Sequence, residues 1–153
     1  MIRKARLEDI SQILKLLDEV LMIHHEIRPD IFKPDTTKYS YDELVQIIND
    51  NYLKVYVYEK DGLVAGHLFY MIHQIEESNN MYSRKELYID DLCVLDGFRK
   101  MGIASELLEF AKQKAKEEGC DYVTLNAWEG NQAIDFYQKR GLKVRKAMME
   151  IKI

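Results

Sequence analysis

The chain has 153 residues, of which 47% are hydrophobic and 31% charged, and its formal net charge is −4 at neutral pH. This length fits one domain with a sizeable core, and the composition excludes a disordered chain. The negative charge argues against nucleic acid as a partner, because that binding favours a clustered positive surface. We therefore expect a single domain over residues 1–153.

Nothing along the sequence has the pattern of a targeting or membrane segment. Met1–Ala5 lacks the apolar core of a signal peptide, and no apolar run approaches the roughly eighteen residues of a membrane helix. Cys93 and Cys120 are too few for a disulfide framework and lie in or beside apolar segments, which favours reduced thiols. The sequence therefore predicts a soluble, cytoplasmic protein without membrane partners.

The first half of the chain reads as a short strand, two helices and a hairpin. Apolar residues recur at helical spacing from Ile10 to Leu21, and Pro29 ends that helix because it removes a donor. Asp61-Gly62 is a hairpin-type turn. The expected elements are a strand at 1–5, helices at 8–26 and 41–51, and strands at 53–59 and 63–74.

The second half begins with a polar loop at 76–83 and then alternates strands with helices. A helix with an apolar face stops at Gly119, and the apolar run Tyr122–Trp128 suits a central strand. The expected elements are strands at 85–95, 122–128 and 143–153, and helices at 103–119 and 131–140. The order β-α-α-β-β-β-α-β-α-β predicts an α/β (α+β) fold, with a mixed central sheet and helices on both faces.

The most informative stretch runs from Leu92 to Ala104, where a strand ends, a turn follows and a helix begins. Free backbone N–H groups and the positive end of the helix dipole meet there, which makes an anion site. The spacing Arg99-x-x-Gly102-x-Ala104 is neither a Walker loop nor the dinucleotide-binding pattern.

A second motif follows about thirty residues later, with Asn126, Asn131, Phe136-Tyr137 and the helix-ending Gly141. Together, and in this order, the two motifs resemble those of the GCN5-related N-acetyltransferases, the GNAT family. The resemblance covers essentially the whole chain, because the expected element order is also that of the family. It implies an N-acetyltransferase that moves an acetyl group directly from acetyl-CoA to a primary amine of a small molecule or peptide.

The resemblance also implies where acetyl-CoA, the co-substrate, would bind. Its pyrophosphate would lie on the main-chain N–H groups of the turn, where small residues let phosphates approach the backbone. Its pantetheine arm would pair with the end of the preceding strand. The implied cofactor-binding residues are Leu92, Cys93, Val94, Arg99, Lys100, Met101, Gly102, Ile103, Ala104, Ser105, Asn126, Asn131 and Tyr137.

Tyr137 is the expected general acid, because a phenol is protonated at neutral pH and can donate to the departing thiolate. The expected base is Asp90 or Asp91, on the strand before the cofactor turn, with Glu129 and Glu26 as lesser candidates. Neighbouring residues on a strand face opposite ways, so only one aspartate should point at the acceptor unless a bulge intervenes.

Neither cysteine lies in a recognisable nucleophile setting, which favours direct transfer without a covalent enzyme intermediate. The histidines form no metal-ligand cluster with the cysteines, so we expect no metal; they are His24, His25, His67 and His73. Segments 22–40 and 75–84 are expected to shape the acceptor pocket.

The alternative hypothesis is a non-catalytic acetyl-CoA-binding module that senses the cofactor and regulates a partner. Failure to acetylate any amine while acetyl-CoA still binds would favour it. The family resemblance also allows a homodimer. The acceptor amine, the preferred acyl chain and the oligomeric state are not determined by the sequence.

Overall fold

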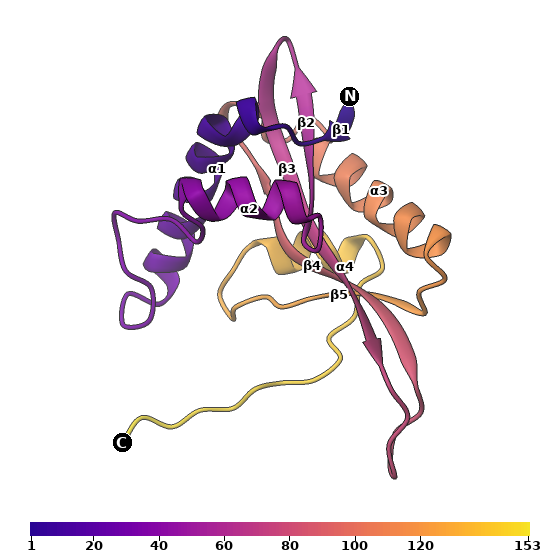
Figure 1. Ribbon diagram of the computed structural model, residues 1–153. Helices are drawn as coiled ribbons and strands as arrows, with labels where there is room; N and C mark the ends of the chain where they lie inside the picture. Colours follow the sequence, from indigo (N-terminus) through magenta and orange to yellow (C-terminus); the bar gives the residue numbers. More distant parts are fainter.

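The computed structural model describes all 153 residues and is built on one five-stranded sheet with the order β1-β2-β3-β4-β5. Neighbouring strands from β1 to β4 are antiparallel, and β5 runs parallel to β4. The β3–β4 hairpin projects far beyond the rest of the sheet (Figure 1). The strands are β1 (Ile2–Lys4), β2 (Lys54–Lys60), β3 (Leu63–Ile75), β4 (Arg84–Val94) and β5 (Tyr122–Leu125).

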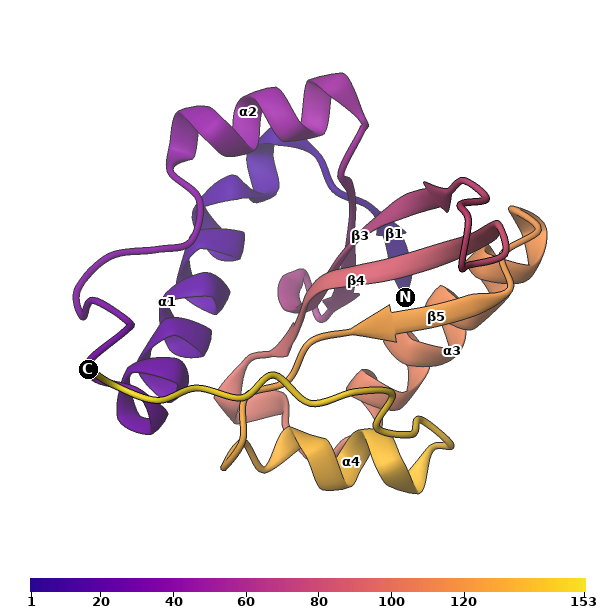
Figure 2. The ribbon, with the colours of Figure 1, turned by 90° about the horizontal axis from the view of Figure 1, so that it is seen from below.

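Helices cover both faces of this sheet, which confirms the predicted fold class (Figure 2). One core lies between the sheet and the first two helices, and the other between the sheet and the last two. None of the helices is long and apolar enough to cross a bilayer. The helices are α1 (Ile10–Ile27), α2 (Tyr41–Asp50), α3 (Ile103–Glu117) and α4 (Ala133–Lys139).

Gly66 on β3 allows α3 to pack closely against the sheet. A Cβ at this position would lie 2.9 Å from the carbonyl oxygen of Cys93 and 3.2 Å from the side chain of Ile103. Ile103 is the first residue of α3 and is itself buried. The missing side chain therefore brings the start of α3 onto the sheet beside the end of β4.

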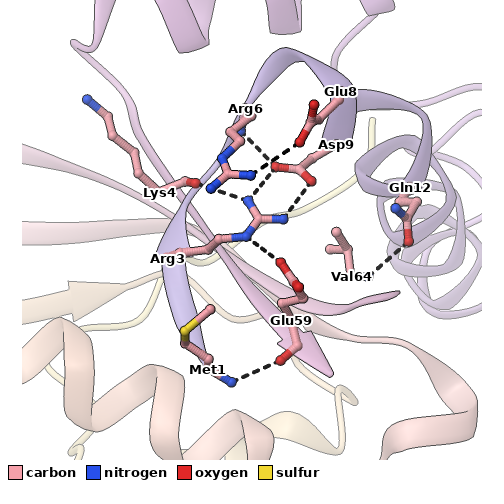
Figure 3. A network of polar contacts seen from close by, with 9 residues as sticks. All are labelled: Met1, Arg3, Lys4, Arg6, Glu8, Asp9, Gln12, Glu59 and Val64. Carbon is pink, nitrogen blue, oxygen red and sulfur yellow. Dashed lines mark hydrogen bonds and ion pairs between the residues drawn. The ribbon is translucent and has the colours of Figure 1, made fainter. Parts of the chain in front are cut away.

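A partly buried ion-pair network ties β1 and β2 to the turn before α1 (Figure 3). Arg3 donates two hydrogen bonds to Asp9, at 2.8 and 2.9 Å, and one to Glu59 at 2.5 Å. The backbone N–H of Arg6 donates to Asp9 at 2.7 Å. Burial alone would raise the pKa of Asp9, but the hydrogen bonds from Arg3 and Arg6 outweigh it and hold that pKa below its ordinary value.

We expect Asp9→Asn to destabilise the fold by about 3 kcal/mol, because it leaves the Arg3 guanidinium without its anionic partner. Because folding lowers the pKa of Asp9, its ionised carboxylate stabilises the native state, and this contribution is complete above about pH 4. The contribution is lost as pH falls further, through the lowered pKa of the folded state. Urea unfolding at pH 7 and pH 3 measures both effects. Asp18→Asn, on an exposed position of α1, is the control that should change little.

The expected final strand at 143–153 is wrong for the single chain. These residues form no strand, are exposed throughout and make no backbone hydrogen bond. They run as an extended segment across the molecule toward the end of α1 (Figure 2), held by the side-chain pairs Arg145–Glu86 and Glu150–Arg28. Because β5 therefore has no outer neighbour, it is an edge strand of four residues. The strand expected over 122–128 exists, but its expected central position and its expected end at Trp128 are wrong.

Candidate active site

A cavity of about 620 Å³ opens where β4 and β5 part. Their pairing stops at Ile89 and Leu125, although β4 continues to Val94. The cavity is lined by the rest of β4, the turn into α3, the residues after β5 and one side of α4. From the other side, α1 contributes Val20, Ile23 and His24.

The turn between β4 and α3 has the features of an anion site. No backbone N–H group of residues 100–105 donates a hydrogen bond within the chain. Lys100 and Gly102 take left-handed conformations, with φ of 64° and 85°, and Gly102 is the residue that precedes the first turn of α3. A run of free amides at the positive end of a fifteen-residue helix favours a bound anion.

All of the sequence-predicted cofactor residues except Met101 line this cavity. The Met101 side chain is 56% exposed and contributes nothing to the lining. Asn131 accepts a hydrogen bond from the amide of Ala133 at 2.9 Å and so fixes the start of α4. The structure therefore brings the two motifs, which are separate in sequence, to one cavity.

Two arginines beside this turn have different roles. Arg99 donates to the carbonyl of Val94 at 3.1 Å and also contacts Glu19, so its side chain holds the turn together. Arg140 lines the cavity, donates to Ser105 Oγ at 2.8 Å and lies 3.9 Å from the centroid of the Phe136 ring. Sequence reasoning missed Arg140, although its position three residues after Tyr137 on a helix places both on one face.

Tyr137 lies half-buried in the same cavity. Burial, and secondarily the nearby carboxylate of Asp91, raises the pKa of its phenol well above the ordinary value. Cys93 also lines the cavity, but its thiol is buried and directed to the carbonyl of Leu16, and burial raises its pKa. A thiol of this kind is a poor nucleophile, because the thiolate is the reactive form.

A β-bulge turns both aspartates to the same face of the sheet. Tyr70 pairs with Ile89 and Phe69 pairs with Asp91, so Asp90 is the extra residue on β4. Asp90 then reaches Tyr39, and Asp91 reaches His67. The bulge was considered in the sequence reasoning only as an exception, and it is the arrangement that the structure has.

The carboxylate of Asp90 is already engaged. It accepts a hydrogen bond from the Tyr39 hydroxyl at 2.6 Å and pairs with Lys38 Nζ at 3.0 Å. These contacts fasten the segment before α2 to β4. Asp90 lines the cavity, but Lys38 balances its charge, and it is the weaker of the two candidate bases.

Asp91 is held from behind by a buried histidine. Its Oδ2 is bonded to Nε2 of His67, whose side chain is fully buried. Its Oδ1 has no hydrogen-bond partner in the chain and is open to the cavity. Sequence reasoning considered His67 only as a possible metal ligand and rejected that role. A histidine inside the apolar run Val64–Tyr70 is nevertheless a signal of a buried polar partner.

The other expectations for the acceptor side are corrected in part. Glu26 and Glu129 are exposed and do not line the cavity. The segment 75–84 contributes no residue either, because it forms the far tip of the β3–β4 hairpin (Figure 1). Within 22–40, the lining comes from the end of α1. No group of three or more metal-ligating side chains occurs in the structure.

The structure is an α/β domain in which a helix start with free backbone amides lies beside two diverging parallel strands. The family follows from the sequence match. A model described as "Acetyltransferase (GNAT) family" matches residues 19–142. The chain therefore belongs to the GNAT acetyltransferase family, which confirms the resemblance carried by the two motifs.

Individual relatives agree with this assignment. The chain is 37% identical over 82 residues to GCN5-related N-acetyltransferase 6, chloroplastic, of Arabidopsis thaliana, a match over 53% of this chain and 26% of that protein. The chain thus spans about a quarter of that relative's length. It is 28% identical over 139 residues to an uncharacterized N-acetyltransferase of Lactobacillus delbrueckii subsp. lactis, covering 84% and 79% of the two chains.

Solved structures show the same fold. A mutant of the BH1408 protein from Bacillus halodurans has a TM-score of 0.95 at 24% identity, over 100% of this chain and 99% of that one. Glucosamine-6-phosphate N-acetyltransferase from Arabidopsis thaliana has a TM-score of 0.73 at 21% identity, over 99% and 97% of the chains.

Proposed function

We propose that this protein is an acetyl-CoA-dependent N-acetyltransferase that transfers acetyl directly to a primary amine of a small molecule or peptide. One observation carries the proposal: free amides at 100–105, the Tyr137 phenol and the open Oδ1 of Asp91 meet at one cavity. Direct transfer agrees with the burial of Cys93. The residues supply an anion site, a proton donor and a proton acceptor around one reaction centre.

Acetyl-CoA would lie along the split between β4 and β5. Its pyrophosphate would sit on the amides of 100–105, with Arg140 at the rim as a cation. The stretch Leu92–Val94 has no β5 neighbour, so its outer backbone groups, apart from the Val94 carbonyl that Arg99 contacts, are free to pair with the pantetheine arm. A backbone N–H donated there to the thioester oxygen would stabilise the tetrahedral oxyanion by about 3 kcal/mol.

Two side chains would carry the proton transfers, Asp91 as the base and Tyr137 as the acid. Asp91 accepts a proton from the ammonium form of the acceptor, directly or through water, so that the neutral amine attacks the thioester carbon. The tetrahedral intermediate loses the second amine proton to solvent as it collapses, so the net reaction releases one proton. Tyr137 protonates the departing thiolate, because its raised pKa keeps the phenol protonated until that anion forms.

The test is acetyl transfer by the purified protein to a panel of primary amines and N-terminal peptides, with products identified by mass spectrometry. We expect an acetylated amine and one free CoA thiol for each product. Calorimetric binding of acetyl-CoA is measured beside it. Binding of acetyl-CoA without any acetylated product would contradict the proposal and favour the alternative, a non-catalytic acetyl-CoA-binding sensor.

We expect Gly102→Val to weaken acetyl-CoA binding about tenfold, because a β-branched residue is strained at φ of 85° and therefore distorts the turn that presents the free amides. The matched control is Gly119→Val, which places a similar strain at φ of 70° beyond the other end of α3. Calorimetry measures both dissociation constants. Equal losses in the two variants would contradict an anion site at Gly102.

We further propose that the protein is a homodimer in which the C-terminal segments, residues 143–153, pair with each other and with β5. Alternate residues of this segment are apolar: Ala147, Met149, Ile151 and Ile153. Such alternation is typical of a strand with one buried face, yet Met149 and Ile151 are more than 80% exposed in the single chain. The unpaired edge of β5 offers the backbone groups that a strand requires.

The path of the segment indicates the pairing direction. Arg145 contacts Tyr122 at the start of β5, and Glu150 contacts Arg28, which lies over Trp128 just beyond the end of β5. The segment therefore runs in the same direction as β5. A two-fold axis perpendicular to the strands reverses their direction. The partner's segment would therefore lie antiparallel to this chain's segment and to its β5.

We expect light scattering to give a mass of twice 18.1 kDa for the protein. Met149→Glu with Ile151→Glu should give the single-chain mass, because charges cannot be buried on the apolar face. The control, Met148→Glu with Lys152→Glu, changes the opposite face and should remain dimeric. A monomeric wild type, or a dimer that survives the first pair of changes, would contradict the proposal.

A further inference from the structure

His67 is an unusual residue for its position on β3. Its neighbours on the strand are buried and mostly apolar, and its own side chain has no exposed surface. Its Nδ1 is the single buried side-chain nitrogen or oxygen without a hydrogen-bond partner. Burying an imidazole with one unsatisfied nitrogen costs free energy. We therefore expect the contact made by its other nitrogen to have a functional role.

That other nitrogen, Nε2, is bonded to Oδ2 of Asp91 and leaves Oδ1 open to the cavity. We propose that His67 is a positioning residue for acetyl transfer: it holds Asp91 so that Oδ1 faces the acceptor amine. This inference rests on the proposed function. His67 itself cannot touch a substrate, because it lies behind Asp91 and is fully buried.

The surroundings favour one protonation state of His67. To hold the carboxylate, Nε2 must carry a proton, and a proton on Nδ1 as well would leave a charged donor without an acceptor. Phe69, whose ring lies edge-on at 4.9 Å from the imidazole, adds no polar partner. The neutral Nε2–H tautomer therefore fits the site, and the negative charge stays on Asp91.

Asp91 also lies near titratable groups from three elements and from the segment before α2. Its charge acts on His24 of α1, Tyr39 before α2, Cys93 of β4 and Tyr137 of α4. None of these four groups is hydrogen-bonded to the Asp91 carboxylate, whereas His67 is. Removing His67 should therefore free the carboxylate to rotate without deleting any group that lines the cavity.

The kinetic test compares His67→Gln with His67→Leu. Glutamine can donate from a similar position, whereas leucine cannot donate at all. We expect His67→Leu to lower kcat about 10–100-fold and to move the acidic limb of the kcat pH profile, as loss of an orienting partner does elsewhere. His67→Gln should restore most of the activity, with acetyl-CoA affinity unchanged in both variants. Wild-type kcat and pH profile in His67→Leu would overturn the inference.

A second measurement does not depend on activity or on the stability of a variant. Nitrogen NMR of the wild-type imidazole should show the neutral Nε2–H tautomer at pH 7, and Asp91→Asn should shift its Nε2 resonance. A proton on Nδ1 alone would overturn the inference. Failure of the proposed function would look different, because the wild type itself would then acetylate no amine.

Discussion

Replacing Tyr137 by phenylalanine is expected to lower kcat by about 100-fold or more, because the departing thiolate then loses its proton donor. The ring keeps its shape, so KM for acetyl-CoA should change less than threefold. Both constants follow from the release of free CoA thiol with the best amine of the panel. The effect should be largest with acceptors whose transfer depends on expulsion of the thiolate.

The matched control is Tyr52→Phe, since Tyr52 is 70% exposed and does not line the cavity. It should leave kcat unchanged. If Tyr137→Phe also left kcat unchanged while acetyl-CoA still bound, the phenol would not be the acid, and a water molecule would have to protonate the thiolate. The enzyme assignment would then stand without this residue.

Asp91→Asn is expected to lower kcat/KM about 100-fold at pH 7, and Asp90→Asn by much less. The two changes are chemically identical and one residue apart. They differ because Oδ1 of Asp91 is open to the cavity, whereas Asp90 is bound by Tyr39 and Lys38. The asparagine at 91 cannot accept the amine proton, so its activity should recover as pH rises and more acceptor is neutral.

The pH profiles of both variants, measured with one amine, decide between the aspartates. A greater loss in Asp90→Asn would reverse their assignment and would make the Tyr39–Asp90 contact part of the chemistry. Thermal unfolding of both proteins separates a lost base from a loosened fold. Unfolding of Asp90→Asn at a lower temperature would agree with its role in fastening the segment before α2.

Most of the secondary structure could be predicted because it depends on local patterns. The apolar repeat at helical spacing predicted α1 to within about two residues at its start, and the turn at Asp61-Gly62 correctly separated β2 from β3. The strand predicted over 143–153 was wrong for a related reason. Its alternating pattern favours a strand, but a strand also requires a neighbour with a free edge, and no local pattern supplies one.

The strand–turn–helix junction between β4 and α3 was predictable from sequence for a similar reason. Arg99, Gly102 and Ala104 act within one strand–turn–helix junction, and the conformation of that junction depends on neighbouring residues. The contact of Tyr137 with the same cavity came only from the family resemblance at the sequence level. The structure adds the physical cause, which is that α4 packs below the split between β4 and β5.

The sequence by itself determined the family, the order of the elements through α4 and the turn between β4 and α3, because each depends on residues close together in the chain. Only the tertiary structure decided which aspartate is free and what holds it. The bulge at Asp90 arises from pairing with β3, and the partners Tyr39 and His67 lie 51 and 24 residues away from their aspartates. Contacts at such separations depend on the packing of whole elements, and local residue patterns do not encode them.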